Sequence, residues 1–251
     1  MTEPSLASPD QSDLDPGSPS LGERVSDVFV APVRAMRAVA VRPAWWLPAL
    51  LAFLVVGLFT LANVQQLMTA QMEARLETAT SQQAAAIEQQ LEMFADPPVW
   101  LRVLTAVGAG LGVVVSGLIF ALVCHLFLRL SEGQGRLGQS VGVVFWAGLI
   151  AYGLKTILGW IVLVATGSVR ATGLTAAALL PDANQQSVGV VVANLLGDPF
   201  AWWMLAVIAL GMAVCHRLQV SRAAVVIVAT YLLLGAVMVG LTLIQQFVSG
   251  A

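Results

Sequence analysis

The sequence predicts an all-α integral membrane protein that crosses the bilayer five times. Hydrophobic residues make up 58% of the 251 residues and charged residues only 10%, whereas a soluble domain carries about 25% charged residues. The mean hydropathy of +0.85 points the same way. A water-soluble core could not bury so much apolar surface, so the composition predicts a lipid environment for most of the chain.

Five apolar runs set the predicted spans. About 20 helical residues, each rising about 1.5 Å, cross a hydrocarbon core of about 30 Å. The predicted spans are residues 44–64, 103–128, 137–166, 199–216 and 223–248. The third contains Lys155, the one formal charge inside these runs, and the short fourth follows a further apolar stretch, residues 188–196.

The arginines predict the orientation, because cytoplasmic loops are enriched in positive side chains. A cytoplasmic N-terminus places eight arginines on the cytoplasmic side: Arg24, Arg34, Arg37, Arg42, Arg129, Arg136, Arg217 and Arg222. It leaves three on the other side: Arg75, Arg102 and Arg170. We therefore predict an N-terminus inside and a C-terminus outside.

The N-terminal region divides into a tail and a membrane domain. Residues 1–22 are rich in Pro, Ser and Asp without an apolar run, which predicts a disordered cytoplasmic tail before a membrane domain at residues 23–250. Pro32 suits the first turn of a helix. We predict that residues 32–41 lie on the inner leaflet, where Arg34, Arg37 and Arg42 would meet anionic lipids. The alternative is a connector whose charges are merely solvated.

Tryptophans and Asp-Pro pairs mark predicted ends of spans. Trp45, Trp100 and Trp202 are expected at membrane interfaces. The second span follows Asp96-Pro97-Pro98-Val99-Trp100, and the fourth follows Asp198-Pro199-Phe200-Ala201-Trp202. Asp caps free N–H groups and Pro suits the first helical position, so both motifs begin helices, and both are expected outside. Residues 65–96 between the first two spans predict an outer helical arm.

The second and fourth spans end alike, in Cys124-His125 and Cys215-His216, so both pairs are expected at one face of the membrane. Zinc would need these ligands to converge tetrahedrally. Adjacent helical residues point about 100° apart, so we expect no metal site. We expect the cysteines to pack as small apolar residues and the imidazoles to lie at the interface.

Two further features concern the membrane interior. Lys155 lies about 25 Å along a helix from Gly138, so we expect it to extend toward the outer interface, without an acidic partner in any run. Gly108, Gly112 and Ser116 repeat every fourth residue, which predicts a face for close helix contact and is compatible with oligomers. Gly138 and Gly142 repeat the same spacing.

Several segments resemble the Yip domain family, the Ypt/Rab-interacting membrane proteins, in its bacterial branch. They are Phe29 to Pro32, Arg42-Pro43-Ala44-Trp45-Trp46-Leu47-Pro48, Gly133 to Ala147, Asp198 to Trp202, Gly211, and Val220-Ser221-Arg222-Ala223-Ala224. The family-motif positions are Pro32, Pro43, Asp198, Phe200 and Gly211. The resemblance implies five spans with a cytoplasmic N-terminus and, in the bacterial branch, a location in the cytoplasmic (inner) membrane. Eukaryotic members bind Rab-type GTPases, but their acidic Gly-Pro motif is replaced here by Arg42-Pro43-Ala44.

No nucleophile, base and orienting group occur at a recognisable spacing, and neither a phosphate loop nor a nucleic-acid footprint is present. The sequence therefore predicts a non-enzymatic organiser or adaptor without a cofactor, which docks anionic lipid or a cytoplasmic protein partner. The alternative is a small-solute transporter or channel that uses Lys155 as a solute contact. An intramembrane enzyme using the Cys-His pairs ranks last.

Overall fold

The computed structural model describes residues 20–76, 81–94, 96–179 and 188–249, and these residues contain no strand. The first half of the chain forms α1 (Leu21–Val30), α2 (Pro32–Val41), α3 (Trp46–Leu76), α4 (Ser81–Phe94) and α5 (Val99–Leu130). The second half forms α6 (Leu137–Gly148), η2 (Leu149–Leu154), α7 (Lys155–Thr166), η3 (Arg170–Gly173), η4 (Ala176–Leu179), α8 (Val188–Leu196), α9 (Pro199–His216) and α10 (Val220–Ser249). The all-helical prediction is confirmed.

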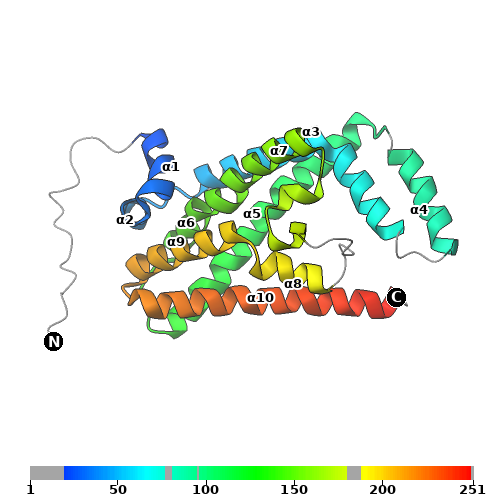
Figure 1. The fold of residues 1–251 in the computed structure, drawn as a ribbon. Coiled ribbons are helices and arrows are strands. Elements are labelled where there is room, and N and C mark those ends of the chain that lie inside the picture. The colour runs from blue at the N-terminus through cyan, green and yellow to red at the C-terminus, as the bar shows by residue number, and fades with distance from the viewer. Residues whose placement is uncertain (1–19, 77–80, 95, 180–187, 250–251) are drawn as a thin grey trace.

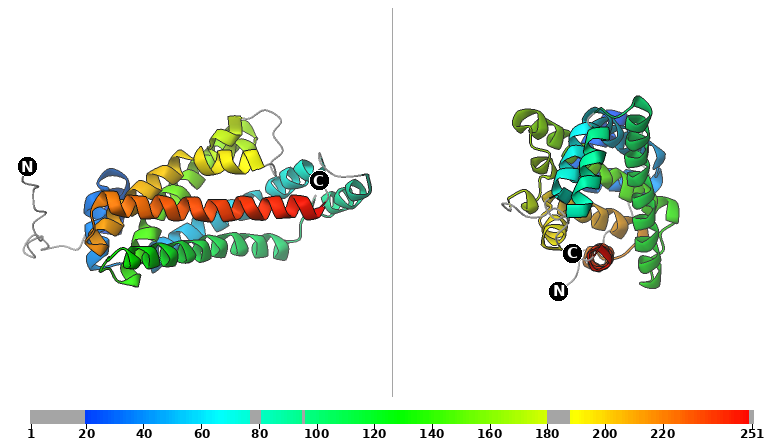
Figure 2. Two further views of the ribbon diagram at one scale, coloured as in Figure 1. Left: turned by 90° about the horizontal axis from the view of Figure 1, so that it is seen from below. Right: turned by 90° about the vertical axis from the view of Figure 1, so that its right-hand side faces the viewer.

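Five helical segments of the described chain are long and apolar enough to cross a membrane. They are Trp46–Glu73, Val99–Leu130, Leu137–Thr166, Pro199–His216 and Val220–Ile244. Each overlaps one predicted span, so the five-span prediction is confirmed. The arm expected at residues 65–96 consists of the end of α3 and of α4, and α4 lies at the end of the bundle opposite α1 and α2 (Figures 1 and 2). The orientation across the membrane remains a prediction.

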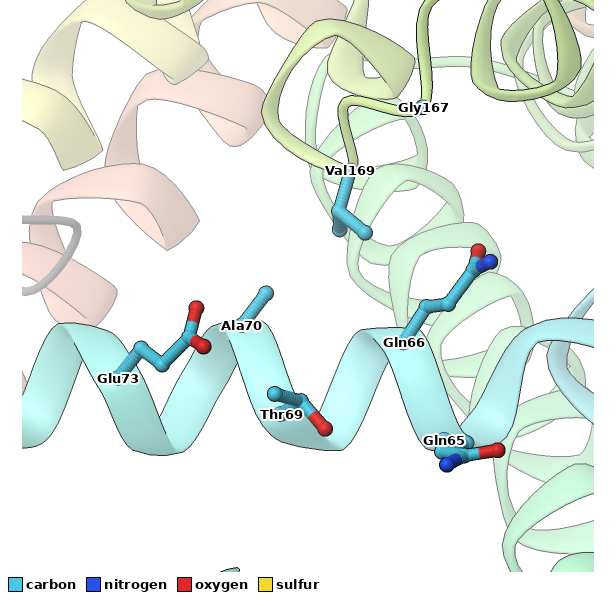
Figure 3. A pocket seen from close by; sticks show the side chains of 7 residues that line it. All are labelled: Gln65, Gln66, Thr69, Ala70, Glu73, Gly167 and Val169. Carbon is cyan, nitrogen blue, oxygen red and sulfur yellow. The ribbon is translucent and has the colours of Figure 1, made fainter. Parts of the chain in front are cut away.

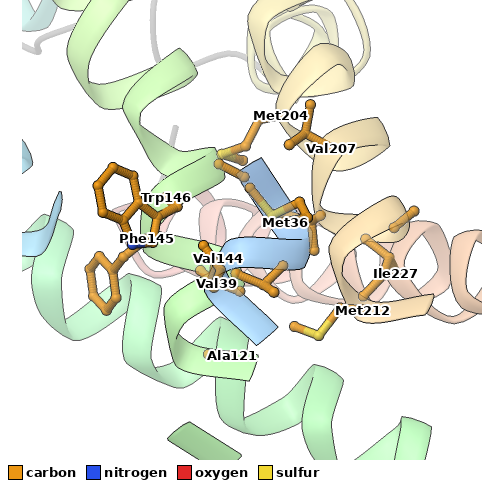
Figure 4. Packing of buried hydrophobic residues seen from close by; sticks show 14 of the residues in the cluster. Met36, Val39, Ala121, Val144, Phe145, Trp146, Met204, Val207, Met212 and Ile227 are labelled. Carbon is orange, nitrogen blue, oxygen red and sulfur yellow. The ribbon is translucent and has the colours of Figure 1, made fainter. Parts of the chain in front are cut away.

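The helix α2 is docked onto the bundle by its apolar face. Ala35, Met36 and Val39 are buried, and Met36 is inserted between α6 and α9 (Figure 4). The absence of a side chain at Gly211 makes this close contact feasible, because a Cβ there would lie 2.7 Å from Met36 Sδ. The apolar face of α2 is thus occupied by protein, and only its other face is available to lipid.

The third span contains a π-helical segment. The α-helix α6 passes into η2 and then into α7 without a break, and Lys155 is the first residue after η2. A π-helical turn places more residues in each turn than an α-helix and so rotates the following helix relative to the preceding one. This rotation contributes to the direction in which Lys155 points.

An interruption of the helical backbone separates α8 from α9, immediately before the fourth span. Asp198 caps α9, because its Oδ1 accepts hydrogen bonds from the N–H groups of Phe200 (3.0 Å) and Ala201 (3.1 Å), and Pro199 occupies the first turn. The last carbonyls of α8 are also satisfied: Trp202 Nε1 donates to Leu196 O and the Tyr231 hydroxyl donates to Leu195 O, both at 2.8 Å. The interruption therefore leaves these polar backbone groups paired.

The two Asp-Pro motifs begin helices of different length. The helix α9 has 18 residues and α5 has 32. Along the helix axis, Trp202 lies about 22 Å from Arg217, whereas Trp100 lies about 43 Å from Arg129. The likeness of the two motifs is therefore local, and it does not place the two tryptophans at equivalent positions in the bundle.

The two glycines of the small-residue face predicted on the second span make no close contact with the other helices of the described chain. Gly108 and Gly112 have no atom within 4 Å of an added Cβ, whereas a Cβ at Gly110 would lie 2.6 Å from the Phe53 ring and 2.9 Å from its carbonyl oxygen. Small residues lie on both sides of this helix, and residues two apart point about 200° apart. Of the second pair, Gly142 packs tightly against Pro43 and Gly138 is open.

We predict that Gly110→Ala destabilises the protein by about 1–3 kcal/mol, since the backbone of Phe53 cannot move without separating α3 from α5. The matched variant Gly112→Ala should be neutral, or stabilising by up to about 1 kcal/mol through helix propensity. Thermal unfolding of detergent-solubilised protein compares them. Equal melting temperatures for the two variants would contradict the packing assigned to α5.

Candidate functional site

The eight arginines predicted on the cytoplasmic side gather at one end of the bundle. Two hydrogen bonds join the segments that carry these arginines. Gln139 Nε2 donates to Ala40 O (2.7 Å), which joins α6 to α2, and the N–H of Gln134 donates to His216 O (3.1 Å), which joins the α5–α6 loop to α9. We call the following set the arginine rim: Arg24, Arg34, Arg37, Arg42, Arg129, Arg136, Arg217 and Arg222. All but the half-buried Arg24 are exposed.

One rim arginine stabilises the contact between α1 and α2. Arg34 Nε donates to Asp27 Oδ2 at 2.9 Å, and a second bond joins Arg34 Nη2 to Asp27 Oδ1. The hydrogen bond and the charge of Asp27 raise the pKa of Arg34 above its ordinary value, so Arg34 stays charged. Because its charge is compensated by Asp27, Arg34 contributes less than the sequence suggested to attraction of an anion.

The outward face of α2 combines positive charge with apolar surface. Arg37 and Arg42 are exposed and have no ion-pair partner among the described residues. Val33 and Val41 lie four residues before and after Arg37 on α2 and are 42% and 64% exposed, and Val30 at the end of α1 is 83% exposed. A face of arginines and valines suits a headgroup region, where the cations meet phosphate or carboxylate and the valines meet the upper acyl chains.

Beneath the rim, two histidines share one serine. Ser140 Oγ lies 3.0 Å from His125 Nδ1 and 2.9 Å from His216 Nε2, and the two rings are 5.2 Å apart. One hydroxyl can donate a hydrogen bond to only one ring, so the other ring must donate to it. The contact joins α5, α6 and α9 at the rim end.

His216 differs from its prediction as an interfacial imidazole, because it is fully buried. The short α5–α6 loop covers it, and a Cβ at Gly133 or Gly135 would lie 2.6 or 2.7 Å from its ring. Cys124 and Cys215 are free and buried, in agreement with packing as small apolar residues. No three His, Cys, Asp or Glu side chains of the described chain converge as a metal site.

Lys155 has an acidic partner, Asp198, which lies just outside the apolar runs that were expected to contain none. Its Nζ lies 2.6 Å from Asp198 Oδ2, and the two side chains are only 20% and 12% exposed. Asp198 immediately precedes the fourth apolar run, so a search within the runs could not find it. Asp198 thus caps α9 and pairs with Lys155 at the same time.

A groove of about 510 Å³ lies beside the C-terminal part of α3, and Figure 3 shows the side chains that line it. Its lining residues come from the C-terminal part of α3 and from the loop after α7: Gln65, Gln66, Thr69, Ala70, Glu73, Gly167 and Val169. Lys155 does not line this groove. The solute contact considered from the sequence is therefore not part of it.

The remaining predicted residues occupy structural positions. Trp45 lies beside Phe145, with ring centroids 6.2 Å apart, and Trp100 is 66% exposed near the start of α5. Pro32 begins α2, and Pro43 O accepts a hydrogen bond from Trp146 Nε1 at 3.3 Å. Sequence reasoning missed Asp27 and Ser140. Asp27 and Arg34 are seven residues apart on either side of Pro32, and this spacing in the sequence could have indicated their ion pair.

Comparisons with known proteins give one positive result. The family model described as the Yip1 domain matches residues 26–242, from within α1 to within α10. Searches of curated proteins and of solved structures find no match.

We predict that Asp198→Asn destabilises the protein by about 3 kcal/mol, because the amide can still cap α9 while Lys155 loses its counter-charge in a buried site. The matched control is Asp96→Asn, which removes an ion pair to Arg102 at the corresponding motif position. The Asp96 side chain is 94% exposed, so the expected loss is only about 0–1 kcal/mol.

A double-mutant cycle completes this test. Combining Asp198→Asn with Lys155→Met removes both charges, and the melting temperature should recover part of the loss caused by the single change. Strictly additive losses in the double variant would contradict a direct interaction between the two side chains.

Proposed function

Because this chain belongs to the Yip1 domain family, we propose that it is a non-enzymatic membrane organiser whose arginine rim gathers anionic lipid at one end of the bundle. It is an integral multi-pass membrane protein, with helices suited to five crossings. The observation that carries the proposal is the outward face of α2, where unpaired Arg37 and Arg42 lie among exposed valines.

The contacts that hold α2 against the bundle support this role. Its inward face is held by Met36 against α6 and α9, and its start is held by Arg34 through Asp27 on α1. A helix fixed on both sides presents its charges in a constant arrangement, which lowers the conformational entropy lost on binding. If the protein acts as an adaptor, the same contacts would hold this surface in place for a cytoplasmic protein partner.

The packing of the interior supports an organiser over the transporter or channel alternative. Between Ser140 and Lys155 on the third span lie the fully buried Val143 and Ile150, and between Asp198 and His216 on the fourth lie the fully buried Ile208 and Met212. These residues belong to one apolar cluster. The histidine contact and the Lys155–Asp198 pair are therefore separated by close-packed apolar side chains rather than joined by polar ones.

We predict that Arg37→Gln combined with Arg42→Gln lowers the phosphatidylserine retained by the protein, by roughly fivefold for each arginine at low salt. Native mass spectrometry of protein released from mixed phosphatidylcholine and phosphatidylserine nanodiscs counts the retained lipid. Arg102→Gln, at the other end of the bundle, is the matched control and should retain the wild-type amount. An unchanged count in the double variant would contradict lipid binding by α2.

We also predict no solute flux. Liposomes containing the protein should retain small anions and sugars at the rate of protein-free liposomes, and Lys155→Met should change nothing. A protein-dependent flux that Lys155→Met abolishes would contradict the organiser and support the transporter.

A further inference from the structure

We propose that the acidic N-terminal tail, residues 1–19, binds the arginine rim and competes there with anionic lipid. This inference rests on the proposed function of the rim and adds its regulation. The occupant is a segment of the chain itself, and the competing ligand is the anionic headgroup of the inner leaflet.

The charge of the tail is complementary to the rim. Residues 1–19 contain Glu3, Asp10, Asp13 and Asp15 and neither Lys nor Arg. The described segments at the rim end contain eight arginines but only three acidic residues, Glu23, Asp27 and Glu132. The tail therefore supplies acidic groups at the end of the bundle where they are scarce.

Most rim arginines are unpaired. Asp27 pairs with Arg34, and Glu132 lies 3.9 Å from Arg222. The exposed rim arginines without an acidic partner among the described residues are Arg37, Arg42, Arg129, Arg136 and Arg217. Such cations attract any tethered anion within about one Debye length, roughly 8 Å at physiological salt.

The attachment point of the tail makes the contact geometrically feasible. The tail joins the bundle at Ser20, which caps α1 through the hydrogen bond that its Oγ accepts from the N–H of Glu23. Because α1 packs beside α2, the tail starts at the rim itself. Nineteen residues span at most about 65 Å, and neighbouring helices lie about 8–10 Å apart, so every rim arginine is within reach. Covalent attachment also keeps the local concentration of the tail high.

Competition follows from the two charges. An anionic leaflet repels the acidic tail and attracts the same arginines, so each rim cation contacts either the tail or a headgroup. In neutral lipid the tail should occupy the rim, and in a phosphatidylserine-rich membrane the headgroups should displace it. Neutralising the tail should therefore increase lipid retention without any change in the bundle.

The contact can be tested in the full-length protein in nanodiscs. A fluorophore on Ser8→Cys is selective, because the natural Cys124 and Cys215 are buried. In phosphatidylcholine alone, its anisotropy should be high at low salt. It should fall at 0.5 M salt (roughly a 4 Å screening length), on addition of phosphatidylserine, and in Arg37→Gln/Arg42→Gln.

A charge-neutral tail provides the second readout. The four changes Glu3→Gln, Asp10→Asn, Asp13→Asn and Asp15→Asn should lower the anisotropy and raise phosphatidylserine retention several-fold. The matched control keeps the charge and changes four neutral residues to Asn, namely Ser5, Gln11, Ser12 and Ser18, and it should behave as wild type. The folded bundle is untouched in both variants.

The outcomes separate this inference from the proposed function. If lipid retention depends on Arg37 and Arg42 but neutralising the tail changes neither readout, the tail inference is wrong and the lipid-binding rim stands. If retention does not depend on the arginines, the proposed function fails and the competition fails with it. Anisotropy that responds to salt, lipid and both sets of charge changes supports the inference.

Discussion

The bundle depends on one carboxylate, Asp198, which serves two helices at once. One of its oxygens caps α9 and the other binds Lys155 on the third span. A lysine in so poorly hydrated a position requires a counter-charge, and a helix that begins within the bundle requires a cap. A single side chain meets both requirements. It thereby marks the start of α9 and joins it to the first residue of α7.

Close packing at the rim end of the bundle determines which side chains are exposed to solvent. Glycines let Met36 contact α9 and let the α5–α6 loop cover His216. With these apolar and aromatic contacts made inside, the long polar side chains of the same segments point outward. The exposed arginines are therefore a consequence of the packing as much as of the composition. They form a charged surface on a rigid support, which is the arrangement that recognition of a lipid headgroup benefits from.

The polar groups inside the bundle differ in role from those on its surface. The Lys155–Asp198 pair and the His125–Ser140–His216 contact lie inside the bundle, and apolar side chains are packed between them. Unpaired charge is concentrated instead on the surface of the rim. The acidic tail is joined to α1 beside that surface, and under the proposed competition salt and lipid composition would decide whether the tail or a headgroup contacts the arginines.

The sequence by itself determined the helical class, the five apolar segments, the beginnings of α2 and α9 and the grouping of the arginines, because these follow from hydropathy, capping and local charge. Only the tertiary structure decided that Gly110 rather than Gly112 packs against α3, that Lys155 pairs with Asp198, and that Arg34 pairs with Asp27. Such contacts depend on the rotation and axial offset of each helix relative to its neighbours. A π-helical segment or a break between two helices changes both, and no local sequence pattern predicts the result.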